Sequence, residues 1–406
     1  MVKKTVRDVE IKGKKVLLRV DYNVPLSDKG EIEDDTRIRE TIPTLQYLID
    51  HGASIILMSH LGRPKGSPDP KFSLHQVAAQ CLEPLLKRKL QFAADCSGNE
   101  AKQKAEALSP GEILMLENLR FHPEEEKNDP IFAKNLASLG DLMVNDAFGA
   151  SHRAHASIAG IPKYIPAVAG FLLEKELNAL SPLLLNPPRP YIALLGGAKV
   201  SDKLCVLKNL LLKVDAVLVG GGMAFTFLKA QGFAVGNSLV EETQIDAVKK
   251  LLETDGKKIK LPSDCLAASS LQSPEQTMNV TFSKDPGSMA NLQGFDLGPA
   301  SIQAFKNFIE ETKPKTVFWN GPMGVFEVPE FSKGTFEIAK ALGAAAKEGA
   351  SVIVGGGDSV AAVHLLGLAK GMTHLSTGGG ASLEFLEGKT LPGVAALVDA
   401  ESSIPK

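Results

Sequence analysis

Short apolar runs that each end in a polar loop recur along the first half of the chain. These runs are residues 15–20, 54–58, 90–93, 112–116 and 142–144. Apolar residues at helical spacing lie between them, at residues 37–51, 74–87 and 131–139. This alternation predicts strand–helix–strand units and an α/β fold with a parallel sheet. All strands of such a sheet end at one edge, and that edge is where open α/β folds bind ligands.

Polar residues follow each predicted strand. Asp21 and Asn23 follow the first one, on the same side of an extended backbone, because side chains alternate along a strand. Basic residues in these strand-end loops are Arg19, Arg37, Arg63, Arg120, Arg153, His60 and His152. Arginine grips carboxylates and phosphates with a planar fork, so their convergence predicts a pocket for a small ligand that bears both groups. A surface role remains the alternative for any single arginine, and we assign it to Arg39, Arg88 and Arg189.

The chain changes character at residues 171–185, an amphipathic helical pattern that the proline-rich residues 186–190 end. We expect a domain boundary with a helical connector there. Beyond it, predicted strands at residues 191–195, 214–219, 316–319 and 351–354 each lead into a glycine-rich loop. A further glycine run, at residues 378–380, opens a predicted helix at 381–386, and residues 261–298 read as strands and loops.

Glycine loops between strands and helices let backbone N–H groups approach an anion at the helix N-terminus. Four such loops in one half of the chain predict a nucleotide site. Tight packing is the alternative for any one of them. The chain lacks a G-x-G-x-x-G fingerprint, which weakens a dinucleotide reading, and it lacks a complete Walker A motif.

Three charged residues in the second half suggest phosphate chemistry. Asp358 follows a glycine triplet and is a candidate Mg²⁺ ligand, with a helix N-cap as the alternative. Lys199 and Lys203 are four residues apart at a predicted helix start, where they would share a face and favour an anion. No nucleophile–base pair stands out, which suits phosphoryl transfer to a carboxylate, since that nucleophile is already ionised.

Length and composition limit the class of protein to which the chain can belong. The chain has 406 residues, 44% of them apolar, and a formal net charge of −2, which favours two globular domains over a bulk nucleic-acid binder. We see neither a signal peptide nor a membrane span and expect a cytoplasmic protein. The scattered Cys81, Cys96, Cys205 and Cys265 are expected to be reduced thiols in the core.

Seven motifs together resemble the phosphoglycerate kinase family, in family order over essentially the whole chain. They are residues 19–25, 59–64, 116–121, 196–203, 319–324, 355–359 and 376–381. The resemblance implies reversible phosphoryl transfer from 1,3-bisphosphoglycerate to Mg-ADP, giving 3-phosphoglycerate and ATP in glycolysis. It also implies two Rossmann-like domains joined by a connector helix. Competing interpretations are a nicotinamide-dependent dehydrogenase and a non-catalytic nucleotide-binding protein.

The resemblance implies a role for each matched residue. It assigns the 3-phosphoglycerate contacts to Asp21, Asn23, Arg37, His60, Leu61, Gly62, Arg63, Arg120 and Arg153. It assigns the nucleotide site to Gly197, Ala198, Lys203, Gly294, Asn320, Pro322, Glu327, Gly356, Gly357, Asp358 and Ser359, with Asp358 holding the metal–nucleotide. Arg37 and Lys199 would stabilise the transferring phosphoryl group, and Gly378, Gly379 and Gly380 would supply backbone donors.

The expected domains follow from the same resemblance. Residues 1–170 with 389–406 form the 3-phosphoglycerate domain, residues 171–188 the connector and hinge, and residues 189–388 the nucleotide domain. The family also implies a monomer with no nucleic-acid or membrane partner.

Two half-sites on separate domains predict that the domains close during catalysis, because the reacting atoms must approach to about 3–3.5 Å in a dry site. We expect small-angle scattering to show a smaller radius of gyration with both substrates than with neither, at a mass matching a 43.2 kDa monomer. An unchanged radius with both substrates bound would contradict closure.

Overall fold

The computed structural model describes residues 2–274 and 276–402, and it divides the chain into two compact units. Unit 1 comprises Met1–Asn178 and Thr390–Lys406, and unit 2 comprises Ala179–Lys389. The helix α8 (Phe171–Leu185) begins in unit 1 and ends in unit 2. None of the helices within the described ranges has the length and apolar character needed to cross a lipid bilayer.

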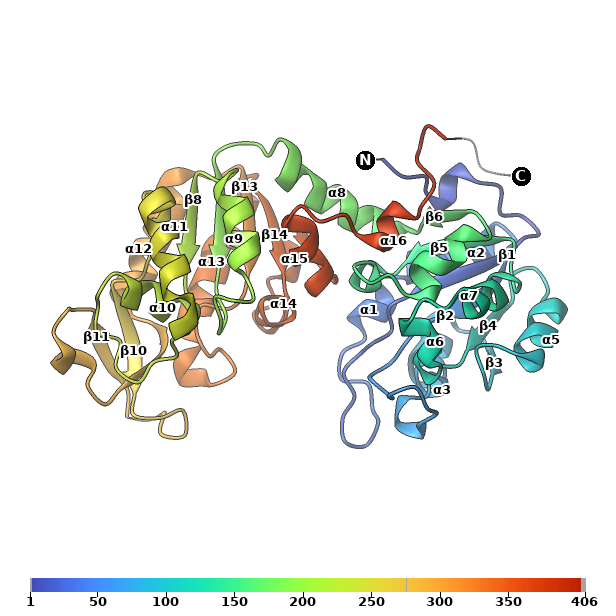
Figure 1. The fold of residues 1–406 in the computed structure, drawn as a ribbon, viewed down its shortest axis with the longest axis horizontal. Coiled ribbons are helices and arrows are strands. Elements are labelled where there is room, and N and C mark those ends of the chain that lie inside the picture. The colour runs from blue at the N-terminus through green and yellow to red at the C-terminus, as the bar shows by residue number, and fades with distance from the viewer. Residues whose placement is uncertain (1, 275, 403–406) are drawn as a thin grey trace. The chain divides into compact units, whose positions relative to one another are not determined.

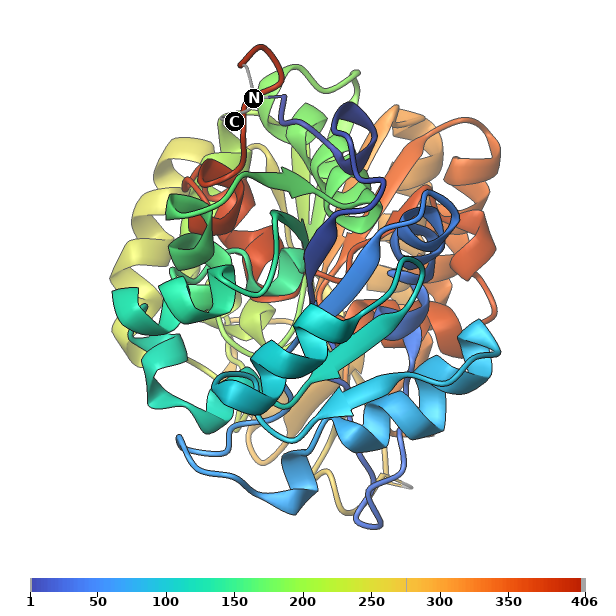
Figure 2. The same cartoon turned by 90° about the vertical axis from the view of Figure 1, so that its right-hand side faces the viewer.

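Unit 1 is built on a six-stranded parallel sheet with the strand order β3-β4-β2-β1-β5-β6. Its strands are β1 (Lys15–Val20), β2 (Ser54–Met58), β3 (Gln91–Ala93), β4 (Ile113–Leu116), β5 (Leu142–Asp146) and β6 (Ala167–Ala169). Figure 2 shows these strands side by side, with helices around them. β1, β2, β4 and β5 are almost completely buried, so helices must cover both sheet faces.

The helices of unit 1 are shorter than the sequence predicts. They are α1 (Thr36–Arg39), α2 (Ile42–Asp50), α3 (His75–Val77), α4 (Glu83–Leu86), α5 (Asn99–Ala107), α6 (Pro123–Glu126), α7 (Pro130–Ala137) and α16 (Pro392–Ala395). The single helix expected at residues 37–51 is interrupted because Thr41 Oγ1 donates to the Ile38 carbonyl at 2.8 Å, and Pro43 occupies the first turn of α2. The helix expected at 74–87 contains a π-helical turn, Ala78–Leu82. α5 and β6 were not predicted from the sequence.

Unit 2 repeats the design with a second parallel six-stranded sheet, in the order β15-β14-β13-β7-β8-β9 (Figure 1). Its strands are β7 (Tyr191–Leu195), β8 (Ala216–Val219), β9 (Ile259–Lys260), β13 (Thr316–Asn320), β14 (Ser351–Gly355) and β15 (His374–Leu375). A small antiparallel sheet contains β10 (Asp264–Ala268), β11 (Met278–Thr281) and β12 (Gln293–Leu297). This sheet occupies residues 264–297, within the region 261–298 that was predicted to contain strands and loops.

Helices flank the large sheet of unit 2. They are α9 (Leu204–Leu211), α10 (Met223–Ala230), α11 (Ile245–Asp255), α12 (Pro299–Thr312), α13 (Lys333–Lys347), α14 (Gly357–Leu365) and α15 (Gly380–Leu386). Trp319 on β13 is fully buried in the core between sheet and helices. Cys81, Cys96 and Cys265 are buried free thiols, as expected, but Cys205 is exposed near the start of α9. The expectation of a core position for Cys205 was therefore wrong, because its side of the helix faces solvent.

A buried carboxylate joins the small sheet to α13. Asp296 on β12 accepts a hydrogen bond at Oδ2 from the Gly334 backbone N–H, at 2.7 Å, in the first turn of α13. Its other oxygen, Oδ1, is buried without a hydrogen-bond partner among the described residues. Burial raises the pKa of Asp296 to about 7, against the opposing effect of two backbone hydrogen bonds.

We predict that Asp296→Asn makes the protein less sensitive to pH. A carboxyl whose pKa is higher in the folded than in the unfolded chain stabilises the fold below its unfolded pKa of about 4, and this stability is lost as pH rises to about 7. Asparagine mimics the protonated acid. We expect urea unfolding to show that the free energy of unfolding of the variant, relative to that of the parent, is on the order of 1–3 kcal/mol higher at about pH 8 than at about pH 5.

Asp246→Asn is the matched control, because it makes the same substitution at an exposed position on α11. Equal pH dependence of the parent and Asp296→Asn would contradict the prediction.

Candidate active site

The carboxyl ends of four neighbouring strands in unit 1 deliver polar residues to one edge of the sheet. Arg19 on β1 is in register with Met58 on β2 and with Asn145 on β5. The residues that follow these positions therefore emerge side by side, and β4 adds Glu117 and Asn118 at the same edge. This geometry follows from parallel pairing, because parallel strands all end in the same direction.

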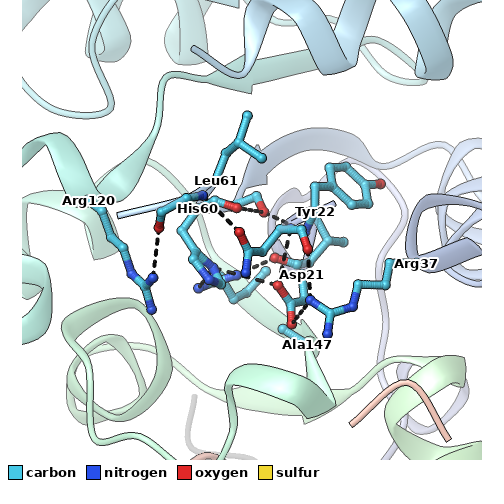
Figure 3. Close-up of polar contacts among 12 residues, drawn as sticks. Asp21, Tyr22, Arg37, His60, Leu61, Arg120 and Ala147 are labelled. Atoms are coloured by element: carbon cyan, nitrogen blue, oxygen red, sulfur yellow. Dashed lines mark hydrogen bonds and ion pairs between the residues drawn. The ribbon is translucent and has the colours of Figure 1, made fainter. Parts of the chain in front are cut away.

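Asp21 and Asn23 connect the first loop to the neighbouring segments. Figure 3 shows Asp21 beside Arg37 and His60. The Asp21 Oδ2 atom lies 3.4 Å from Nη1 of Arg37, and the same Nη1 donates to the Asn23 carbonyl at 2.9 Å. Asn23 Oδ1 accepts from the Gly62 N–H at 2.8 Å, which ties the β1 loop to the β2 loop. Between them, Tyr22 is fully buried, and its hydroxyl lies 2.9 Å from Thr41 Oγ1.

His60 lies beside a buried arginine. Arg19 is 1% exposed, and its Nη2 lies 3.2 Å from His60 Nδ1. A guanidinium can only donate, so His60 Nδ1 accepts and the ring proton is on Nε2. Burial, together with Arg19, Arg120 and Arg37, holds the pKa of His60 well below its usual value. His60 is therefore a neutral donor at physiological pH.

A second buried group supports Arg19 from behind. Arg19 Nε donates to Ser157 Oγ at 2.9 Å, and Ser157 Oγ donates to Glu125 Oε1 at 2.5 Å. Ser157 N also donates to Glu125 Oε2 at 2.9 Å. Burial raises the pKa of Glu125, and the positive charge of Arg19 acts in the opposite direction. Glu125 and Ser157 were not predicted to belong to the site, because Glu125 is the middle of three glutamates that resemble an ordinary acidic helix start.

The predicted arginines have different environments. Arg120 is largely buried, and its Nη1 donates to the Gly62 carbonyl at 3.0 Å. Burial lowers the pKa of Arg120, Glu126 opposes this effect, and Arg153 and Arg19 add repulsion. Arg63 and Arg153 are exposed. Crowded cations repel one another, so an anion bound among them is stabilised. Arg19, in contrast, lies behind His60 in the core.

Loop backbones at this edge are held by Asn118. Its Nδ2 donates to the Leu61 carbonyl at 2.7 Å and to the Phe72 carbonyl at 2.9 Å. The Leu61 side chain is buried, and Gly62 has a φ of +63°, with no room for a side chain beside Phe72. Asn118 lies in the motif at residues 116–121, for which no structural role was predicted.

In unit 2, glycine loops pack directly on one another at the ends of β7, β8 and β13. The Gly197 N–H donates to the Pro322 carbonyl at 2.8 Å. A Cβ on Gly196 would lie 2.0 Å from the Pro322 oxygen, and one on Gly221 would lie 2.6 Å from Gly197 N. Close backbone packing thus explains these glycines without a ligand. Gly357 and Gly379 differ, because a Cβ there would meet no described atom within 4 Å.

Lys203 points back toward β13. Its Nζ donates to Asn320 Oδ1 at 2.6 Å, and burial lowers its pKa to about 8, with Asp358 and Asp202 opposing. Lys199 is exposed and lies outside the helix, since α9 begins only at Leu204. The expectation that both lysines share a helix face was wrong, because a turn at residues 201–203 intervenes.

The loop after β14 leads into α14. Gly356 is the N-cap, with a φ of +88°, and Asp358 is exposed in the first turn. Asp358 is therefore not the N-cap that the alternative interpretation required. Ser359 is buried, and its Oγ accepts from the Gly321 N–H at 2.6 Å. The Nδ2 atom of Asn320 is a buried donor without a partner among the described residues.

The remaining predicted residues are spread over unit 2. Gly294 lies in β12, where a Cβ would be 2.2 Å from Phe225 Cζ. Ala198 and Glu327 are exposed. Gly378 N donates to Ser376 Oγ at 3.2 Å, Gly379 is the N-cap of α15, and Gly380 begins that helix.

Comparison with known proteins gives one consistent result. A family model described as "Phosphoglycerate kinase" matches residues 6–389. Phosphoglycerate kinases of Chlorobium phaeobacteroides and Moorella thermoacetica are both 54% identical to the chain, over 98% of it and 100% of each relative. Among solved structures, the Coxiella burnetii phosphoglycerate kinase has a TM-score of 0.85 at 40% identity, covering 97% of this chain and 98% of that one. The Pyrococcus horikoshii phosphoglycerate kinase has a TM-score of 0.84 at 33% sequence identity, and the match covers 98% of each chain.

We predict that His60 remains neutral and keeps its proton on Nε2 when the pH is lowered from about 7 to about 5.5, because the unperturbed pKa of histidine is about 6.5. Nitrogen-15 NMR of the imidazole rings measures both properties, and loss of the signal in His60→Gln provides the assignment. Protonation of His60 near pH 6.5, or a ring proton on Nδ1, would show that Arg19 does not fix the ring as described.

Proposed function

Because the chain belongs to the phosphoglycerate kinase family, we propose that it transfers a phosphoryl group reversibly between 1,3-bisphosphoglycerate and ADP, with each unit holding one substrate. It is an enzyme of the kinase class with the family's two-sheet α/β fold, and its relatives take small-molecule substrates, a nucleotide among them. We also infer a cytoplasmic, monomeric, glycolytic enzyme. The family match supports these last properties, and the scattering mass tests the monomer.

The observation that carries the proposal is the cationic edge of unit 1. His60 is a neutral donor surrounded by the charges of Arg19, Arg37 and Arg120. We assign the 3-phosphoglycerate contacts to this edge, with Asp21 and Asn23 for the hydroxyl and carboxylate end and the arginines for the negative charges. Arg63 and Arg153 are exposed to an incoming phosphate, with Arg153 Nε donating to His152 Nε2 at 3.2 Å, whereas the buried Arg19 positions His60.

We assign the nucleotide to the loops of unit 2. The half-buried Lys203 donates to Asn320, and the buried Nδ2 of Asn320 has no partner among the described residues. A Cβ on Gly356 would lie 3.0 Å from that Nδ2. The open space at Gly357 and Gly379 allows phosphates to approach the starts of α14 and α15.

The residues present fit Mg²⁺ at Asp358. Its carboxylate is exposed and not committed to a helix cap, and Mg²⁺ favours one or two carboxylates together with substrate phosphates. When bound, Mg²⁺ would neutralise charge on the nucleotide phosphates.

The mechanism then needs no general base. The carboxylate of 3-phosphoglycerate is an ionised nucleophile, so catalysis consists of positioning and charge stabilisation. Arg37 donates to Asn23 O and lies beside Asp21, which holds its guanidinium at the strand edge. We propose that Arg37 and the exposed Lys199 stabilise the transferring phosphoryl group.

A coupled assay for ATP formation from ADP and 1,3-bisphosphoglycerate tests the assignment. We expect activity in the parent and a fall in kcat of roughly 10²–10³-fold in both Arg37→Ala and Lys199→Ala, the usual effect of removing a group that stabilises transition-state charge.

Arg39→Ala and Lys208→Ala are matched controls. Arg39 lies on the same short helix as Arg37 but is exposed and paired with Asp35, and Lys208 is exposed on α9. Parent-like kcat in Arg37→Ala and Lys199→Ala would refute the mechanism, and an inactive parent would favour a non-catalytic nucleotide-binding protein.

A further inference from the structure

Three potential metal ligands come together in unit 1, outside the proposed substrate contacts. Asp95 and Cys96 lie just after β3, and His122 follows the 3₁₀ turn Leu119–Phe121. One donor atom from each lies within 4.8 Å of the other two. Asp95 Oδ1 and His122 Nε2 are already 2.6 Å apart. Two segments distant in sequence thus present a thiol, an imidazole and a carboxylate to one point.

The chemistry of this donor set indicates which cation it would take. Mg²⁺ and Ca²⁺ prefer oxygen ligands, whereas Zn²⁺ is bound by cysteine, histidine and carboxylate together. We propose that Asp95, Cys96 and His122 form a Zn²⁺ site, with water completing a tetrahedral shell. Nothing in the phosphoryl-transfer mechanism uses these residues.

The three proposed ligands differ in how deeply they are buried. Cys96 is completely buried, while the side chains of Asp95 and His122 are 48% and 29% exposed. A cation bound here would therefore contact two partly exposed side chains and one buried sulfur. The His122 ring stacks on Phe132, with centroids 5.2 Å apart, which restricts its orientation. Burial raises the pKa of the Cys96 thiol, so a free thiolate is disfavoured without a compensating positive charge.

An ordinary aspartate–histidine hydrogen bond above an inert thiol is the competing explanation. It accounts for the 2.6 Å contact and for the buried sulfur separately. The two explanations differ in what Zn²⁺ does. In the zinc site, the cation joins the turn after β3 to the loop that carries Arg120, and it stabilises unit 1 by binding only the folded chain.

The test uses the full chain after removal of metals with a chelator. We expect ZnCl₂ titration to show one equivalent bound, with a rise in Tm. Co²⁺ should give a thiolate-to-cobalt charge-transfer band. Cys96→Ser should lose the band, and His122→Gln should bind Zn²⁺ at least roughly tenfold more weakly. Because His122 is partly exposed, its variant remains informative if Cys96→Ser fails to fold.

Cys205→Ser is the matched control, since Cys205 is an exposed free thiol in unit 2. It should bind Zn²⁺ like the parent. The proposal is overturned if the parent binds no stoichiometric Zn²⁺, if Cys96→Ser and His122→Gln both bind it unchanged, or if only Cys205→Ser loses binding. These outcomes are read from Zn²⁺ binding and Tm, so they are distinguishable from the outcome of the kinase assay.

Discussion

Parallel pairing of β1 with β2 and β5 is the constraint on which the unit 1 site depends. This register makes the strands end together, so Asp21, His60 and Asp146 emerge at one edge although they are far apart in sequence. The sheet is buried on both faces, so a register shift would displace its apolar side chains from the neighbours they pack against. The core therefore fixes the positions of the polar loops more firmly than the loops could fix themselves.

A charged side chain buried behind the loops also helps to fix the geometry of the site. Arg19 is held in the core by Ser157, which in turn is held by Glu125. Removing one partner of such a buried network leaves an uncompensated charge, at a cost of about 3–5 kcal/mol. The network thus couples the stability of unit 1 to the orientation of His60. The buried carboxylate of Asp296 has a comparable structural role in unit 2, where it joins β12 to α13.

The sequence predicted the order and positions of the main strands closely, because each is a short apolar run bounded by turn residues. Helix interruptions were harder to predict, since the π-helical turn at Ala78–Leu82 shows no Gly and no clear loss of apolar spacing. The shared helix face of Lys199 and Lys203 was predicted wrongly, because a turn before α9 has no strong sequence signal. Glu125 could not be recognised, because its burial depends on the packing of Ser157 from a segment 32 residues away.

The sequence alone determined the residue types at the strand ends, the two α/β repeats and the motifs that resemble the phosphoglycerate kinase family. Local pattern suffices for these features, since they depend on neighbours in the chain. Only the tertiary structure decided which arginines are buried and which nitrogen of His60 carries the proton. It also decided which glycines are in close backbone contact and which have open space beside them. Those properties depend on atoms brought together by the fold, and sequence separation hides them. The meeting of Cys96 with His122 is such a case.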